Sequence, residues 1–251
     1  MSHIIPIGSG STGNSIYIEL DDKKLLVDMG IGFKKVRDAL LKHNRNIKDI
    51  EAIFVTHGHS DHIKARQAIT NNTSCDLYTN DTVYYYLADL KAHTNILEFD
   101  VPYFIDDLKI TMFKVGHDYR NTGGFIFEYH DQKVGYVTDC GKLTKKIYNY
   151  LKGSDVIVIE SNHDIDMLKN GPYPYDLQKR ILSTVGHLSN EECAMNINKL
   201  YEDGTNNFLL AHLSRENNRP DIALKETLKA LNGKEANVYI CPVEGDDLLS
   251  F

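Results

Sequence analysis

The segment Thr56-His57-Gly58-His59-Ser60-Asp61-His62 places four potential metal ligands within six residues. It directly follows the apolar run IEAIFV at residues 50–55, which predicts a buried strand. On extended backbone the side chains of His57 and His59 point the same way, so both imidazoles can reach one ion. Asp61 and His62, at the turn into a predicted helix, can reach a second ion beside the first. Because four such groups packed together without a cation would be costly, we expect the chain to fold around metal ions.

The rest of the chain alternates short apolar strands with amphipathic helices. We predict strands at residues 4–7, 16–20, 24–28, 50–55 and 76–79, in the stretches 97–104, 108–115, 124–130 and 133–139, and at 155–159, 207–211 and 238–241. We predict helices at residues 33–43, 62–69, 82–91, 190–201 and 222–231, a short one after 144, and helical pieces within 164–183. No linker or long-period repeat interrupts this pattern. The sequence therefore predicts a single α/β domain over residues 1–251.

Charge and cysteine content limit the partners and the compartment. The chain has 35 acidic and 28 basic residues and a formal net charge of −7. This balance argues against a globally basic nucleic-acid-binding surface but allows a local basic patch. No run approaches the roughly 20 apolar residues of a membrane-spanning helix, so we expect no membrane insertion. The absence of a signal pattern and the four well-separated cysteines (Cys75, Cys140, Cys193 and Cys241) predict reduced thiols in the cytoplasm.

The loop Gly8-Ser-Gly-Ser-Thr-Gly13 matches the pattern GxGxxG but does not predict a dinucleotide site. A dinucleotide fingerprint opens a helix whose N-terminus binds the pyrophosphate. The sequence that follows here, SIYIEL, has strand character. We interpret the loop as a hairpin turn, or as a group of backbone N–H groups that binds an anion near the metal site.

The HxHxDH motif and the polar residues after later strands resemble the metallo-β-lactamase-fold hydrolase superfamily. The further motifs of that superfamily match Asp28 after the third strand, His117 in VGHD, Asp139 in YVTDCG and His212 in LLAHLS. The resemblance covers nearly the whole chain. It implies a four-layer αβ/βα sandwich with two metal ions at one edge, between the sheets.

The resemblance also implies roles for these residues. One ion would be bound by His57, His59 and His117, and the other by Asp61, His62 and His212. Asp139 would bridge the two ions, and Asp28 would orient ligands through hydrogen bonds. This mixture of imidazole and carboxylate ligands suits Zn²⁺ or Mn²⁺.

Two more motifs resemble the phosphodiesterase branches of the superfamily. Glu160, in VIESNHD, follows the strand after Asp139, and His187, in GHLSN, precedes a predicted helix. Together with SGSTGNS, GPYPYDLQKRI and HLSRENN, these segments most resemble the WalJ/YycJ (VicX-like) branch of bacterial exonuclease-like proteins. The resemblance implies a DNA exonuclease that digests in the 5′ to 3′ direction.

The leading hypothesis is therefore a two-metal phosphodiesterase that hydrolyses nucleic acid, DNA in particular. Asp61 and Asp139 would orient the attacking oxygen. Glu160 would hold His187, which would protonate the leaving sugar oxygen. Two alternatives remain open: a hydrolase of a small cyclic phosphodiester or thioester, and a regulatory metal-binding protein. Among nearby residues, Arg120 and Arg215 are candidates for phosphate binding and His163 for shaping the pocket.

Overall fold

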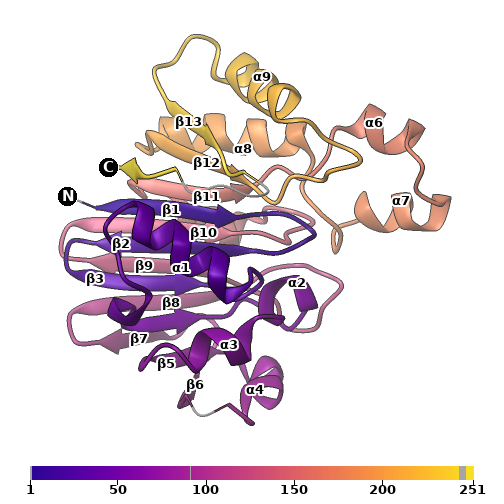
Figure 1. The fold of residues 1–251 in the computed structure, drawn as a ribbon. Coiled ribbons are helices and arrows are strands. Elements are labelled where there is room, and N and C mark those ends of the chain that lie inside the picture. Colours follow the sequence, from indigo (N-terminus) through magenta and orange to yellow (C-terminus); the bar gives the residue numbers. More distant parts are fainter. Residues whose placement is uncertain (1, 91, 243–246) are drawn as a thin grey trace.

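The computed structural model describes residues 2–90, 92–242 and 247–251, and within these residues two seven-stranded sheets pack face to face (Figure 1). The strands of the first sheet, in spatial order, are β14 (Leu249–Ser250), β1 (His3–Gly8), β2 (Ser15–Leu20), β3 (Lys23–Val27), β4 (Ala52–Phe54), β5 (Asp76–Thr79) and β6 (Thr94–Ile96). Those of the second sheet are β13 (Asn237–Ile240), β12 (Asn207–Ala211), β11 (Val156–Glu160), β10 (Gln132–Val137), β9 (Gly123–Tyr129), β8 (Leu108–Lys114) and β7 (Pro102–Ile105).

Helices cover the outer face of each sheet. The first sheet is covered by α1 (Phe33–Lys42), α2 (Ser60–Ile63), α3 (Arg66–Thr70) and α4 (Asp81–Leu87), with a short 3-10 turn at Ile47–Asp49. The second is covered by α5 (Lys145–Leu151), α8 (Asn190–Glu202) and α9 (Pro220–Leu231). The short helices α6 (Ile165–Asn170) and α7 (Tyr175–Ile181) project from one edge of the molecule (Figure 1).

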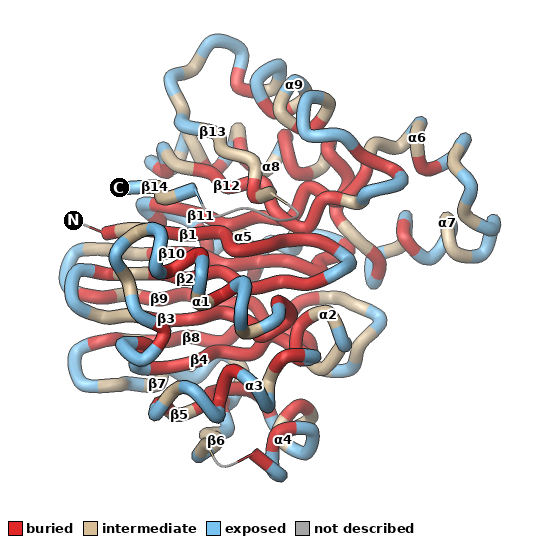
Figure 2. The backbone as a smooth tube through the Cα atoms, viewed as in Figure 1, coloured by how far each residue is buried: buried red, intermediate tan, exposed pale blue. Residues whose placement is uncertain are grey.

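Successive side chains of each strand point to opposite faces of its sheet, and this alternation explains the layers. In β2, Ile16 and Ile18 face the core between the sheets, whereas Tyr17 packs under the helices of the first sheet. In β11, Val158 faces the core between the sheets and Ile159 packs under the helices of the second. Strands that are buried on both faces read as continuous apolar runs, and Figure 2 shows them as the buried centre of the molecule. The predicted four-layer sandwich is confirmed.

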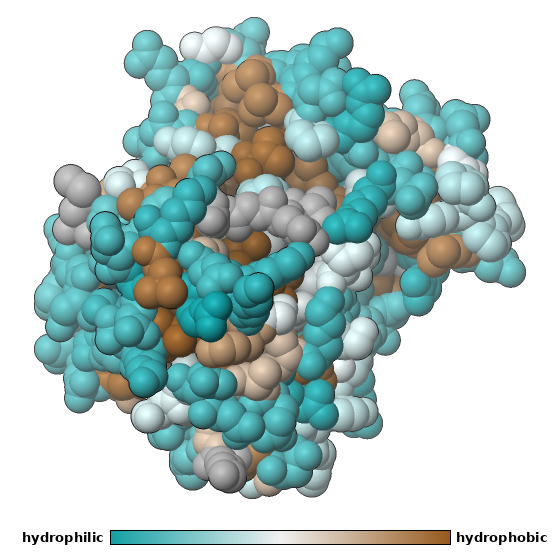
Figure 3. Space-filling view, in the orientation of Figure 1, coloured by the Kyte–Doolittle hydropathy of each residue, from teal (hydrophilic) through white to brown (hydrophobic). Residues whose placement is uncertain are grey.

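The surface is consistent with this layered core. Figure 3 shows a mostly hydrophilic face on which hydrophobic residues form separate, smaller patches. None of the helices in the described residues is long and apolar enough to cross a bilayer.

Several predicted boundaries were wrong. The helix predicted at 62–69 is two helices, α2 and α3, because the N–H of Ala65 donates to the carbonyl of Met29 in the loop after β3. The strand predicted at 97–104 begins only at Pro102, since Asp100 adopts a left-handed conformation with φ of 69°. The helix predicted at 82–91 ends at Leu87, and its predicted last residue, Lys91, lies outside the described residues.

Candidate active site

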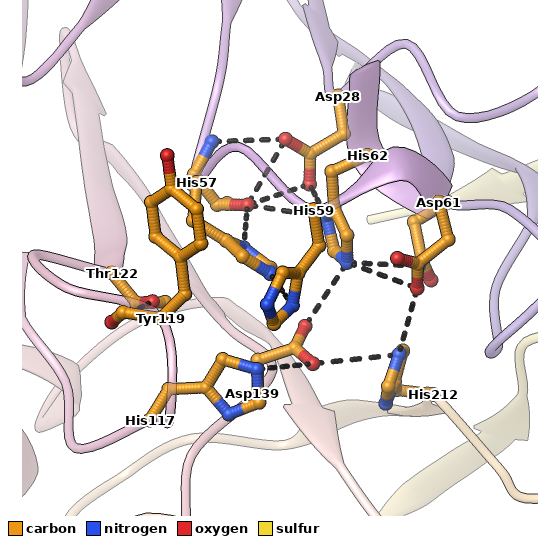
Figure 4. Close-up of polar contacts among 12 residues, drawn as sticks. Asp28, His57, His59, Asp61, His62, His117, Tyr119, Thr122, Asp139 and His212 are labelled. Carbon is orange, nitrogen blue, oxygen red and sulfur yellow. Dashed lines mark hydrogen bonds and ion pairs between the residues drawn. The ribbon is translucent and has the colours of Figure 1, made fainter. Parts of the chain in front are cut away.

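The predicted ligands come together because they follow strands that run in parallel. β3 pairs in parallel with β4, and β10, β11 and β12 also pair in parallel. The carboxyl ends of parallel strands lie at the same edge of a sheet. The two sheets bring these edges together, so that segments far apart in the sequence meet in one cluster (Figure 4).

The backbone turns sharply at three residues that directly follow strands. Asp28 follows β3 with φ of 63°, Asp139 follows β10 with φ of 53°, and His212 follows β12 with φ of 56°. Positive φ is uncommon in residues other than glycine, although Asp and His tolerate it better than most. Strained backbone of this kind persists only where surrounding contacts hold it in place, and it is common at functional sites. Here it occurs at three residues whose side chains belong to the cluster.

Two groups of side chains are arranged so that each could hold one ion. The ligand atoms of His57, His59 and His117 lie within 4.8 Å of one another, and so do those of Asp61, His62 and His212. These are the two sets that the resemblance implied.

Asp139 lies between the two groups (Figure 4). Its Oδ2 is 3.2 Å from Nε2 of His62, and its Oδ1 is 3.5 Å from Nε2 of both His117 and His212. A carboxylate that bridges two ions must contact both ligand groups, and Asp139 is placed to do so.

The cluster contains buried polar atoms that a metal ion would satisfy. Among the described residues, Nε2 of His117, Nε2 of His212 and Oδ2 of Asp139 make ion-pair contacts within the cluster but no hydrogen bond. Such orphaned atoms are rare in proteins because each carries a desolvation cost. Three of them in one cluster of imidazoles and carboxylates form a donor set that fits divalent cations.

In three histidines of the cluster, the other ring nitrogen, Nδ1, lies within hydrogen-bond distance of a neighbouring acceptor. Nδ1 of His62 is 2.7 Å from Oδ2 of Asp28, Nδ1 of His117 is 3.3 Å from the carbonyl oxygen of Gly186, and Nδ1 of His212 is 2.9 Å from Oε1 of Glu160. Because each Nδ1 faces an acceptor, it would keep its proton when Nε2 gives up its own and binds a metal. Asp28 is therefore placed to orient His62, and its role at a metal site stays a prediction. It also accepts hydrogen bonds from the N–H and hydroxyl of Thr56, at 2.9 and 3.0 Å.

Glu160 connects the metal ligands to the second predicted site residue, His187. Its Oε1 lies 2.8 Å from Nδ1 of His187 as well as 2.9 Å from Nδ1 of His212. Its Oε2 accepts hydrogen bonds from the backbone N–H groups of Cys140 and Leu188, at 2.9 and 3.0 Å. Asp139, Glu160, His187 and His212 also form a group with metal-binding spacing. Because both oxygens of Glu160 are already occupied by donors, we interpret Glu160 as a residue that positions the two rings.

The backbone explains why Glu160 and His187 meet. The segment after β11 runs beside the segment before α8, where the N–H of Asn162 donates to the carbonyl of Leu188 and the N–H of Asn190 donates to that of His163. Gly186 lets the segment before α8 pass close to the end of α7, since a Cβ there would lie 2.1 Å from the carbonyl oxygen of Ile181.

Electrostatics in the cluster favour cations. Burial lowers the pKa of His62, but the carboxylates of Asp28 and Asp139 outweigh it and raise that pKa to about 10. Burial raises the pKa of Glu160, but the His187 imidazole outweighs it and lowers that pKa to about 2. The pKa of His187 is raised: burial lowers it, and Glu160 more than compensates. Without a metal, the ionised carboxylates of this poorly solvated site are therefore balanced by protonated imidazoles, and bound cations could take over that role.

A cavity of about 190 Å³ opens beside this cluster. His187 and His212 line it, together with Ser11 and Ser214. Arg180, from α7, also lines it and forms an ion pair of 2.6 Å with Asp118. A reacting group bound here would therefore contact both a predicted ligand and His187.

The other predicted site residues lie in different surroundings. Arg120 is exposed and has no hydrogen bond or ion pair within the described part of the chain, so its phosphate-binding role stays a prediction. Arg215 lines a separate cavity next to the site. His163 is buried, and its two ring nitrogens have no hydrogen-bond partner among the described residues. Burial lowers the pKa of His163 to about 4, and its side chain does not line the active-site cavity.

Two further side chains lie at the site and were not predicted from the sequence. Nδ2 of Asn14 lies 3.0 Å from Nε2 of His62 and 3.3 Å from Oδ2 of Asp61. The loop that carries Asn14 joins the antiparallel strands β1 and β2, so it is the predicted hairpin turn, and only its backbone had been considered. The ring of Tyr119 lies 5.5 and 5.0 Å from those of His57 and His59, centre to centre. Its position two residues after His117 was the available signal.

Known proteins match this chain over most of its length. Residues 23–212 match the family model of the beta-lactamase superfamily domain. The chain is 34% identical to exodeoxyribonuclease YycJ of Bacillus anthracis over 238 residues, which cover 92% of this chain and 90% of the relative. It is 35% identical to exodeoxyribonuclease WalJ of Streptococcus pneumoniae over 224 residues, which cover 86% of this chain and 83% of the relative.

Solved structures agree on the fold. The metallo-beta-lactamase fold protein YhfI from Bacillus subtilis superposes with a TM-score of 0.74 at 18% identity, covering 99% of this chain and 98% of that one. The chain therefore belongs to the beta-lactamase superfamily domain family and, within it, to the metal-dependent hydrolases represented by the YycJ and WalJ exodeoxyribonucleases.

Proposed function

We propose that this protein is a two-metal phosphodiesterase that removes nucleotides from DNA ends in the 5′ to 3′ direction. The observation that carries the proposal is the pair formed by Glu160 and His187. Nδ1 of His187 lies 2.8 Å from Oε1 of Glu160, and the ring lines the cavity next to His212. Hydrolysis of a phosphodiester releases a sugar oxygen of high basicity, which needs a proton donor on the leaving side. The names of the two curated relatives support DNA as the substrate.

The site residues have different roles in the proposed reaction. When bound, two divalent cations supply Lewis acidity, activate a water molecule and offset charge on the phosphoryl oxygens. His57, His59 and His117 would hold one cation, Asp61, His62 and His212 the other, and Asp139 both. The Asp61 carboxylate accepts a hydrogen bond from the attacking water. His187 donates a proton to the departing oxygen, while Glu160 keeps its ring in place.

Metal identity and location complete the proposal. A ligand set of imidazoles and carboxylates suits Zn²⁺ or Mn²⁺. We assign the protein to the cytoplasm as one domain of residues 1–251. The compartment is supported by the four cysteines, which are all buried and unpaired.

The test is digestion of matched single- and double-stranded DNA and RNA by protein loaded with Mn²⁺ or Zn²⁺. With a 5′ label, the first labelled product should be a mononucleotide. With a 3′ label, a ladder of shortening strands should appear. Asp139→Ala, which lacks the bridging carboxylate, is the control for contaminating nucleases.

Each other outcome counts against a part of the proposal. Faster digestion of RNA would overturn DNA as the preferred substrate. Intact polymers together with cleavage of bis-p-nitrophenyl phosphate would favour the small-molecule hydrolase. Loaded protein that cleaves neither substrate would favour a metal-binding protein without this activity.

A further inference from the structure

A second cavity, of about 650 Å³, is lined by four basic side chains. They are Lys34 and Lys35 at the start of α1, Lys64 after α2, and Arg215 after β12. We call this cavity the basic pocket. Within the described residues no carboxylate forms an ion pair with Lys34, Lys64 or Arg215. In a chain with a net charge of −7, such a group of cations concentrates positive charge locally.

The basic pocket borders the active-site cavity. Ser11 and Ser214 line the active-site cavity, and the next residue in each loop, Thr12 and Arg215, lines the basic pocket. Two pairs of consecutive residues therefore form a common rim. Lys64 reinforces this rim, because its ammonium group donates to the carbonyl oxygen of Thr12.

The lining chemistry suits a nucleic-acid strand. The ammonium and guanidinium groups offer donors and charge for phosphate oxygens. Ile31 and Phe33 also line the pocket and add apolar surface that a sugar or a base could cover. A strand whose reacting phosphate lies beside His187 could pass over the rim and place its neighbouring phosphates among these cations.

We propose that the basic pocket binds backbone phosphates of the nucleic-acid strand next to the bond that is cleaved. This inference rests on the proposed function, since it assumes that the substrate is a polymer with several phosphates. It gives the active site a local anion-binding track that the overall charge of the protein does not provide.

The test measures the salt dependence of binding. A fluorescein-labelled single-stranded DNA with phosphorothioate linkages is titrated with metal-loaded protein, and anisotropy gives the Kd between 50 and 200 mM NaCl. For single strands, each lost phosphate contact lowers the slope of log K against log salt by about 0.7. The Lys34→Ala/Lys64→Ala variant should therefore bind more weakly at low salt, with a slope smaller by about 1.4.

Two further variants are controls. One removes two lysines elsewhere on the protein, and the other replaces the pocket lysines without changing their charge. Lys145→Ala/Lys199→Ala removes two lysines that line another cavity, of about 440 Å³, between α5 and α8, and it should bind like the wild type. Lys34→Arg/Lys64→Arg keeps the charge and should keep the wild-type slope. Metal content and the unfolding midpoint of each variant show whether its fold is intact.

The outcomes distinguish this inference from the proposed function. An unchanged slope in Lys34→Ala/Lys64→Ala, or an equal loss in Lys145→Ala/Lys199→Ala, would overturn the basic pocket as the phosphate site. Wild-type protein that binds ordinary DNA with this salt dependence but never hydrolyses it would instead overturn the proposed function.

Discussion

Removal of the His187 imidazole should separate leaving-group chemistry from metal binding. In His187→Ala, Glu160 loses one partner but keeps Nδ1 of His212 at 2.9 Å and the N–H groups of Cys140 and Leu188 at 2.9 and 3.0 Å. The buried carboxylate therefore remains satisfied and continues to hold His212. We expect the variant to bind as much metal as the wild type.

The size of the effect should depend on the leaving group. A positioned general acid typically contributes 10²- to 10⁴-fold, or about 2.7–5.4 kcal/mol of transition-state free energy. DNA releases a basic sugar oxygen, so kcat/KM on DNA should fall by about that factor. Bis-p-nitrophenyl phosphate releases p-nitrophenolate, which leaves without a proton. With that substrate kcat/KM should fall by less than about tenfold, because it needs no general acid.

The assay compares kcat/KM on both substrates with metal content by elemental analysis. His130→Ala is a matched histidine deletion at the turn between β9 and β10, where the side chain is 55% exposed. It should change neither kcat/KM on the two substrates nor the metal content. Equal losses on DNA and on the aryl ester would refute the general-acid role. Loss of metal from His187→Ala would show that His187 is a ligand.

The remaining predictions concern the bridging carboxylate, the packing beside it and the thiols. Asp139→Ala should lose most bound metal and activity, because its oxygens lie 3.2 to 3.5 Å from histidines of both ligand groups; two ions in elemental analysis with full turnover would disprove bridging. Gly58→Ala should destabilise the protein by less than about 1 kcal/mol in urea unfolding, since a Cβ there would lie 2.3 Å from Oη of Tyr119, the end of a side chain that can move aside. The Gly58→Ala/Tyr119→Ala double variant should lose less unfolding free energy than the two single variants together. Strictly additive losses would show that the two residues do not clash. Thiol titration of unfolded, unreduced protein should find four free groups, and a count of two would reveal a disulfide.

Four of the predicted ligands were visible in the HxHxDH segment itself, and the resemblance supplied His117, Asp139 and His212, each of which follows an apolar strand. A buried strand is visible as a run such as DVIVI or NFLLA, and a polar residue at its end lies at a sheet edge. The order of the motifs then indicated which strand ends meet. The pairing of Glu160 with His187 came from the resemblance to the phosphodiesterase branches, which carry an acid after this strand and a histidine before a later helix.

Contacts made by loops were not predictable from these patterns. Asn14 reaches His62 only because the backbone N–H of Asn14 donates to the carbonyl of Asp61, which joins two loops at the site. Gly30 permits this approach, since a Cβ there would lie 1.6 Å from that same carbonyl oxygen. The break between α2 and α3 has a similar cause, because it depends on a hydrogen bond to a distant loop. Such contacts depend on tertiary packing, which local sequence periodicity does not contain.

Glu160 shows most clearly what the structure adds to the sequence motifs. The motifs predict a single partner for Glu160, His187, but its Oε1 also lies 2.9 Å from Nδ1 of His212. One buried carboxylate thus positions both a predicted metal ligand and the predicted proton donor, whose rings stack with centres 5.2 Å apart. A substitution at Glu160 would disturb both rings and could not distinguish metal binding from proton transfer. A substitution at His187 removes only one of them, and it is therefore the change whose result can be interpreted.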